Sequence, residues 1–195
     1  MILKNFGDPQ RKIDSRTDAG QIGLCVGLFF LLFLAILLVS QFQLEQIRAS
    51  DDYLQDALAA SGLASALVDI REYGRTHVIR IEDREAAYGQ YCRSLRANLG
   101  LDENWECGNR RLISGRVKVE NYTIYNVENG QVTCSRMDGG REEISVGALG
   151  AVCAPNGQLI ENTSIYSEIS YPFKGLFGWT VQARKGKLVD IVGED

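Results

Sequence analysis

Cysteines are the side chains of this 195-residue chain best suited to covalent chemistry, and there are five of them. Four follow a long apolar run. An even number of cysteines outside the cytoplasm favours disulfides, because that compartment is oxidising. Three pairings are possible, and buried free thiols are the alternative. We predict the two local bridges, Cys92 with Cys107 and Cys134 with Cys153.

Other reactive side chains form no recognisable catalytic pattern. His77 is the single histidine and is interpreted as structural or exposed, and no C-x-x-C pair accompanies it to suggest zinc. The carboxylate neighbours at 102–103 and 142–143 lie in loop-like sequence and are interpreted as solvated charges. A nucleophile elbow, a Walker loop and a dinucleotide fingerprint are all missing. The sequence therefore predicts a protein that is not an enzyme and needs neither cofactor nor metal.

One segment near the N-terminus is suited to a lipid environment. No charged side chain occurs from Ala19 to Leu44, and residues 22–39 are apolar apart from glycine. A helix needs about 20 such residues to cross the hydrocarbon core. We therefore predict a tail at 1–20, a transmembrane helix at 21–41 and one domain at 42–195.

The flanking charges predict the orientation of this helix. The tail is basic, whereas the stretch just after the apolar run is mainly acidic. Because positive charge is retained in the cytoplasm, we expect a cytoplasmic N-terminus and an extracytoplasmic domain in the cell membrane. A cleaved signal peptide is the alternative, but VSQFQLEQ lacks a small-x-small site. The net charge of −4 argues against nucleic acid as a partner.

The sequence predicts an α+β domain, with helices on one face of an antiparallel sheet. A proline-free stretch predicts that the membrane helix continues as an amphipathic helix over about 42–73. Its small residues between Ala57 and Ala66 favour packing on the chain's own sheet over packing on another subunit. A second helix is expected at about 83–99, with Asp83 as N-cap and Gly100 as the stop.

The sheet is expected over about 112–192. Asn129-Gly130 between strand-like runs is a strong hairpin signal, and Asn156-Gly157 marks another turn. Further strands are predicted at 143–146, 165–173, 178–184 and 188–192. The last two are separated by an expected turn at Lys185-Gly186.

Glycines mark one side of the predicted membrane helix. Gly23 and Gly27 have the G-x-x-x-G spacing that permits close helix approach in lipid. They are candidate packing residues. Cys25, between them, is interpreted as apolar packing, with acylation as the alternative.

The segment SRTDAGQIGLCVGLFFLLFLAILLVSQFQLEQIR, followed by a helix and a sheet, resembles TadE-like minor pseudopilins of tight-adherence (Flp) pilus systems, which have a type IV pilin-like architecture. The resemblance implies cleavage by a prepilin peptidase after Gly20, leaving Gln21 as the new N-terminus. Family members often carry glutamate at the fifth position after the cut, where this chain has Cys25.

The resemblance implies a non-enzymatic role in assembling a pilus or secretion apparatus in the cell envelope. The expected partners are membrane lipid and other pilin-like or pilus-assembly proteins. The alternative is a membrane-anchored extracellular binding or sensor module. That module would need a partner protein, because a tail of about 20 residues is too short to be a signalling domain.

Overall fold

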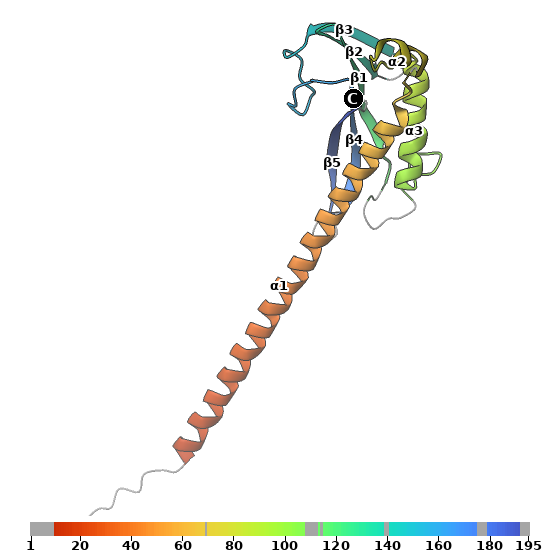
Figure 1. Cartoon of the computed structure of the whole chain (residues 1–195). Helices are drawn as coiled ribbons and strands as arrows, with labels where there is room; N and C mark the ends of the chain where they lie inside the picture. Colours follow the sequence, from red (N-terminus) through yellow and green to blue (C-terminus); the bar gives the residue numbers. More distant parts are fainter. Residues whose placement is uncertain are drawn as a thin grey trace, which may run out of the picture. The chain divides into compact units, whose positions relative to one another are not determined.

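The computed structural model describes residues 10–68, 70–107, 113, 115–138, 141–174 and 179–191. Within these ranges the chain is α+β, with helices α1 to α3 and one antiparallel sheet of five strands (Figure 1). Residues 1–9 of the predicted tail and the predicted sheet limits, 112 and 192, lie outside the described residues. The chain divides into two compact units, residues 1–46 and 47–195.

Helix α1 (Gln10–Ser65) contains the whole apolar run. Large apolar side chains from Ile22 to Val39 are exposed, so this part of the first unit has no protein core of its own. Ser40, at the end of the run, donates its hydroxyl to the Ile36 carbonyl at 2.9 Å, which satisfies the side chain within the helix.

The predicted continuous helix at 42–73 is wrong in its last part. Helix α1 ends at Ser65, and the separate helix α2 (Ile70–Thr76) follows. Between them Val68 forms an antiparallel bridge with Ile81, which is fully buried. Tyr122 on the sheet donates its hydroxyl to Ser65 Oγ at 3.0 Å, just where the helix ends. These distant contacts compete with helix propensity, which carries no stop signal at this point.

Helix α3 (Arg84–Leu99) has the caps that the sequence predicts. The Asp83 carboxylate accepts the Ala86 N–H at 2.9 Å, and Gly100 ends the helix in the left-handed conformation with φ 61°. One face of the helix is buried in the domain core, and Cys92 lies partly buried against that core. The buried residues are Ala87, Tyr91, Leu95 and Leu99.

The sheet has the strand order β3-β2-β1-β4-β5, with every neighbouring pair antiparallel. Its strands are β1 (Lys118–Glu128), β2 (Gln131–Asp138), β3 (Arg141–Ala148), β4 (Ser164–Lys174) and β5 (Thr180–Asp190). The predicted Asn129-Gly130 hairpin is confirmed, and both residues have the positive φ that a type I′ turn requires. Gly157 likewise has a positive φ in the predicted turn at 156–157.

A β-bulge in β1 changes which side chains face the helices. The register with β4 shifts between Val119 and Asn121, which leaves Glu120 as the extra residue. Val117 and Val119 before the bulge, and Tyr122 after it, therefore contact the same core. In a regular strand with no bulge at Glu120, strict alternation would place Tyr122 on the face opposite to Val117 and Val119.

That core lies between the sheet and helices α1 and α3. It joins Leu54 and Leu58 of α1 to Ile124 of β1 and Ile165 of β4, all essentially inaccessible to water. The opposite face of the sheet carries a smaller cluster covered by the connection between β3 and β4. Its buried members are Tyr125, Val132, Ala154, Ile160 and Tyr166.

The predicted turn at Lys185-Gly186 is wrong, because β5 passes through it without interruption. Gly186 is needed here for close packing rather than for a turn. A Cβ atom at this position would lie 2.9 Å from Tyr166 Cζ, and the Tyr166 side chain is 3% exposed. Glycine inside a strand often marks such a close approach.

We expect Gly186→Ala to lower the free energy of unfolding by about 1–3 kcal/mol, because the new methyl group would overlap the buried Tyr166 side chain. Gly89→Ala in α3 is the matched control, since a Cβ there meets no atom within 4 Å. That change should instead stabilise the protein by about 0.5–1 kcal/mol through helix propensity. Urea unfolding of the detergent-solubilised full chain measures both. Equal effects of the two substitutions would contradict the packing role of Gly186.

Candidate functional site

The apolar part of α1 is the most distinctive surface of the chain. Helix residues from Gly20 onward include a window with mean hydropathy 3.1, none of it buried in the structure. By length and composition this helix is able to cross a membrane. Outside a membrane, an apolar surface of this size would be exposed to water, which is unfavourable because the hydrophobic effect favours its removal from water.

The candidate packing glycines lie on this helix. Gly23 and Gly27 are four residues apart and so lie on the same side of α1. A Cβ atom at Gly20, Gly23 or Gly27 would meet no other atom within 4 Å. Among the described residues nothing therefore packs closely on these glycines, and their role in helix association stays a prediction.

The bond predicted to be cleaved also lies in α1. Gly20 and Gln21 are both helical and exposed. They are thus accessible on the helix surface. Cleavage after Gly20 stays a prediction.

The predicted cysteine pairs fall into two separate clusters of the domain. Cys92 and Cys107 both pack against the core beneath the helices, and the Cys107 thiol lies 3.6 Å from the Leu99 carbonyl oxygen. Cys134 packs in the cluster on the opposite face, together with Val152, whereas Cys153 is exposed. No disulfide joins any of the five cysteines, all of which are among the described residues. Burial raises the pKa of the Cys92 and Cys134 thiols, which disfavours their reactive thiolates.

The disulfides therefore stay a prediction that labelling can test. Protein isolated without reductant and then denatured should leave the four domain cysteines unmodified by iodoacetamide, while reduction should add four adducts. Denaturation removes the protection that burial gives to Cys92 and Cys134. Four labelled domain thiols before reduction, read by peptide mass, would contradict both bridges.

Small residues of α1 pack against other elements of the domain, in agreement with the preferred interpretation. A Cβ atom at Gly62 would lie 3.2 Å from Val189 Cγ2 of β5, so the helix and strand are in close contact. Ser61 accepts a hydrogen bond from Asn98 of α3 at 3.1 Å. This part of α1 therefore already packs on the chain's own sheet and on α3.

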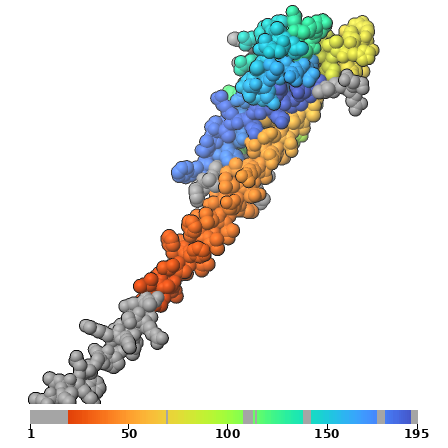
Figure 2. Space-filling model, turned by 60° about the vertical axis from the view of Figure 1, so that its left-hand side comes forward, coloured from red at the N-terminus to blue at the C-terminus, as the bar shows by residue number. Residues whose placement is uncertain are grey.

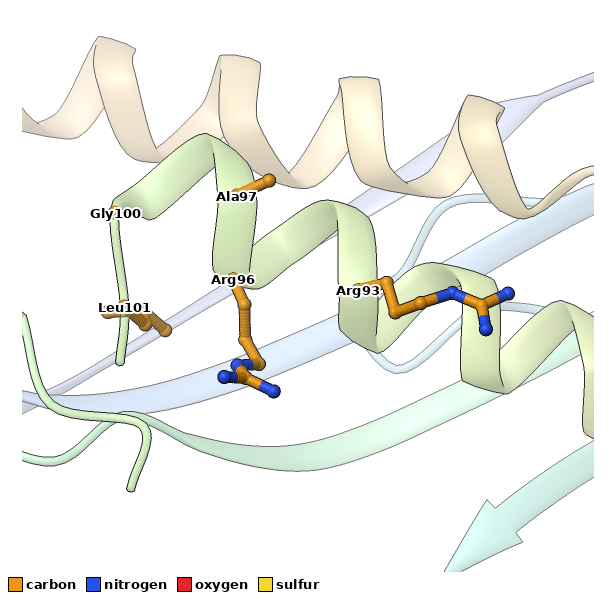
Figure 3. Close-up of a pocket in the computed structure, with 5 residues that line it drawn as sticks. All are labelled: Arg93, Arg96, Ala97, Gly100 and Leu101. Atoms are coloured by element: carbon orange, nitrogen blue, oxygen red, sulfur yellow. The ribbon is translucent and has the colours of Figure 1, made fainter. Parts of the chain in front are cut away.

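A shallow pocket of about 340 Å³ lies at the C-terminal end of α3. Its lining residues are Arg93, Arg96, Ala97, Gly100 and Leu101 (Figure 3). The two guanidinium groups point in different directions in Figure 3, and each has a local acceptor, Gln90 Oε1 for Arg93 and the Asp102 carbonyl for Arg96. Basic side chains at a helix C-terminus also interact favourably with the helix dipole. The pocket is therefore explained by local structure.

The structure does not bring the other candidate side chains into one site. His77 is exposed in a left-handed conformation, with its ring 6.0 Å from that of Tyr73. Asp102 caps its own turn, and Glu142 pairs with Arg84 at 2.5 Å. Among the described residues no three His, Cys, Asp or Glu side chains are grouped as metal ligands.

Buried tyrosines make the domain sensitive to alkali. Burial raises the pKa of Tyr122 and of Tyr125 to about 12, above the value of about 10 expected when unfolded. The folded state thus favours the neutral phenols. Their stabilising effect is complete below about pH 10 and is lost as pH rises toward 12.

We therefore expect the urea midpoint of the full chain to fall between about pH 9 and about pH 11.5. Tyr125→Phe removes one titrating phenol, and the fall should be smaller in that variant. Far-UV circular dichroism measures both titrations. A midpoint that does not change over this range would contradict the prediction.

Two features of the described structure were missed by the sequence argument. Asn126, inside β1, bonds to both backbone groups of Ile81, and nothing local to β1 predicts this contact. Trp179, just before β5, and Val181, near its start, are 78% and 58% exposed. Their apolar character resembles that of core strand residues, and only the strand's place at the sheet edge explains their exposure.

Comparison of the chain with family models, curated proteins and solved structures found no match. The class that the structure defines is an α+β protein with one N-terminal helix long and apolar enough to cross a membrane.

Proposed function

We propose that this chain is a membrane-anchored, pilin-like protein that acts without catalysis in assembling a pilus or secretion apparatus. The observation that carries the proposal is α1. One helix holds an exposed apolar segment and then, after residue 47, a face packed on an antiparallel sheet. A helix used in these two ways is what the resemblance to type IV pilin-like proteins leads us to expect.

The distribution of small residues supports assembly through the membrane segment. Gly62 and Ser61 are already packed within the domain, whereas a Cβ atom at Gly23 or Gly27 would meet no atom of the described residues within 4 Å. In lipid, helices associate through close packing at small residues rather than through the hydrophobic effect. The glycines of the apolar segment are therefore the proposed contact with other pilin-like helices.

Intact mass spectrometry of protein recovered from the host membrane tests this function. We expect a chain beginning at Gln21, because a prepilin peptidase would cleave after Gly20. Gly20→Leu is the matched variant, since it places a bulky side chain at the bond and should leave the tail attached. A wild-type chain beginning at Met1 would contradict processing as a pilin. A start beyond Ser40 would contradict anchoring altogether.

A further inference from the structure

Strand β3 forms one edge of the sheet, and its outer side has no partner among the described strands. Its register with β2 runs without a shift from Arg141 to Ala148, so this edge is regular along its whole length. Edge strands commonly avoid pairing with other chains through lysine, proline or a β-bulge. β3 has none of these, whereas β5 at the opposite edge carries Lys185 and Lys187. The edge of β3 is therefore suited to accept a further strand.

Ile144 and Val146 give this edge an apolar face. Ile144 lies opposite Ser135 of β2, which in turn lies opposite Ile124 in the core beneath the helices. Residues directly opposite in a sheet share a face, and side chains alternate along a strand, so Ile144 and Val146 are both on the helix side. The helices do not cover them, since they are 53% and 63% exposed. In Figure 2 the teal part of the chain, which includes β3, lies at the surface.

The backbone groups of the same two residues point away from the sheet. Leu149, just after β3, donates its N–H to the carbonyl of Gly130, which directly precedes β2, at 2.9 Å. Backbone groups alternate in direction along an antiparallel strand. Those of Ile144 and Val146, an odd number of residues before Leu149, therefore point outward. Both residues thus offer an N–H, a carbonyl and an apolar side chain to a strand added at this edge.

We propose that β3 pairs in antiparallel orientation with β3 of a second copy of this chain, with Ser145 on the two-fold axis. Ile144 of each copy then lies opposite Val146 of the other. Each such pair exchanges two backbone hydrogen bonds and brings two β-branched side chains together, which stabilises paired strands. The edge is self-complementary in this register, as a two-fold interface between identical chains requires.

The charges of β3 favour a second copy in this arrangement. Its carboxylates, Glu142 and Glu143, are both in the first half of the strand, and the antiparallel register places them opposite Ala148 and Gly147. The acidic halves of the two strands are thus kept apart. Parallel pairing in matched register would bring them side by side, and like charges directly opposite are destabilising. The inference goes beyond the proposed function, because it uses residues of the domain alone.

Hydrogen exchange at the Ile144 amide of the full chain in detergent tests this pairing. The amide reports the edge itself, whatever else holds two chains together. We expect it to exchange at least about tenfold more slowly in wild type than in Val146→Lys, which places a charge in the interface. The Ser145 amide, which points toward β2, is the internal reference. Val181→Lys is the matched control, since Val181 is also an exposed valine on the helix side of an edge strand.

A mixture of two variants tests the register and shows that the pairing is between chains. Ile144→Glu should not pair with itself, because each new glutamate would lie opposite the apolar Val146 of the second copy. When this variant is mixed with Val146→Lys, the new glutamate lies opposite the new lysine, and the other Ile144–Val146 pair is unchanged. Slow exchange at the remaining Ile144 amide should return, and native mass spectrometry should show a heterodimer.

Each contrary result would overturn the inference. An Ile144 amide that exchanges as fast in wild type as in Val146→Lys would show that no strand covers this edge. Equal losses of protection in Val146→Lys and Val181→Lys would show that the effect is not specific to β3. Failure of the mixture to restore protection would exclude pairing of β3 with itself in this register. None of these results bears on cleavage after Gly20, which tests the proposed function separately.

Discussion

Leu58→Ala is expected to lower the free energy of unfolding by about 3 kcal/mol, one of the two largest effects we expect from a single substitution. Leu58 lies in α1 and is 0% exposed. It belongs to the core that joins α1 to α3 and the sheet. Removing a buried leucine side chain loses its transfer free energy and leaves a cavity, which together cost about 2–5 kcal/mol.

The matched control for Leu58 lies five residues further along the same helix. Leu63 is 55% exposed, and Leu63→Ala should change stability by less than about 0.5 kcal/mol. Both variants keep helix propensity nearly constant, because leucine and alanine are both good helix formers. Urea unfolding of the full chain in detergent, followed by circular dichroism, gives both values. Equal losses in the two variants would contradict the placement of this face of α1 on the sheet.

Asn126→Ala is expected to cost about 2–4 kcal/mol. The Asn126 side chain accepts the Ile81 N–H at 2.9 Å and donates to the Ile81 carbonyl at 3.0 Å. Alanine would leave both backbone groups buried without these partners, and each unsatisfied group costs about 1–3 kcal/mol. The same chain segment is held by Thr163, which donates to the Ile79 carbonyl at 2.9 Å.

Asn162→Ala is the control for this substitution, because Asn162 is exposed and removal of its amide exposes no buried group. It should leave stability unchanged within about 0.5 kcal/mol. Hydrogen exchange at the Ile81 amide gives a second readout, and its protection should fall in Asn126→Ala. Retained protection with unchanged stability would show that Asn126 does not hold this segment.

Local chemistry was enough to predict several elements. Asp83 and Gly100 predict both ends of α3, because a capping carboxylate and a left-handed glycine act within a few residues of the helix. Asn129-Gly130 predicts its hairpin for the same reason. The apolar run predicts a helix long enough for a membrane from length and composition alone. The position of the glycines on that helix follows from spacing, although their partners do not.

Long-range packing decided the features that the local pattern predicted wrongly or not at all. Helix α1 ends at Ser65, where the Tyr122–Ser65 hydrogen bond and the Val68–Ile81 bridge replace further helical contacts. No local helix breaker marks that residue. Gly186 resembles a turn residue, yet the Tyr166 ring on the neighbouring strand explains it.

The sequence by itself therefore determined the apolar N-terminal helix, the α+β class, the caps of α3 and the Asn129-Gly130 turn, since these depend on neighbours along the chain. Only the tertiary structure decided where α1 stops, that β5 is a single strand and that Trp179 is exposed. The physical reason is that each of these depends on contacts between residues far apart in sequence, and their energies outweigh local propensity.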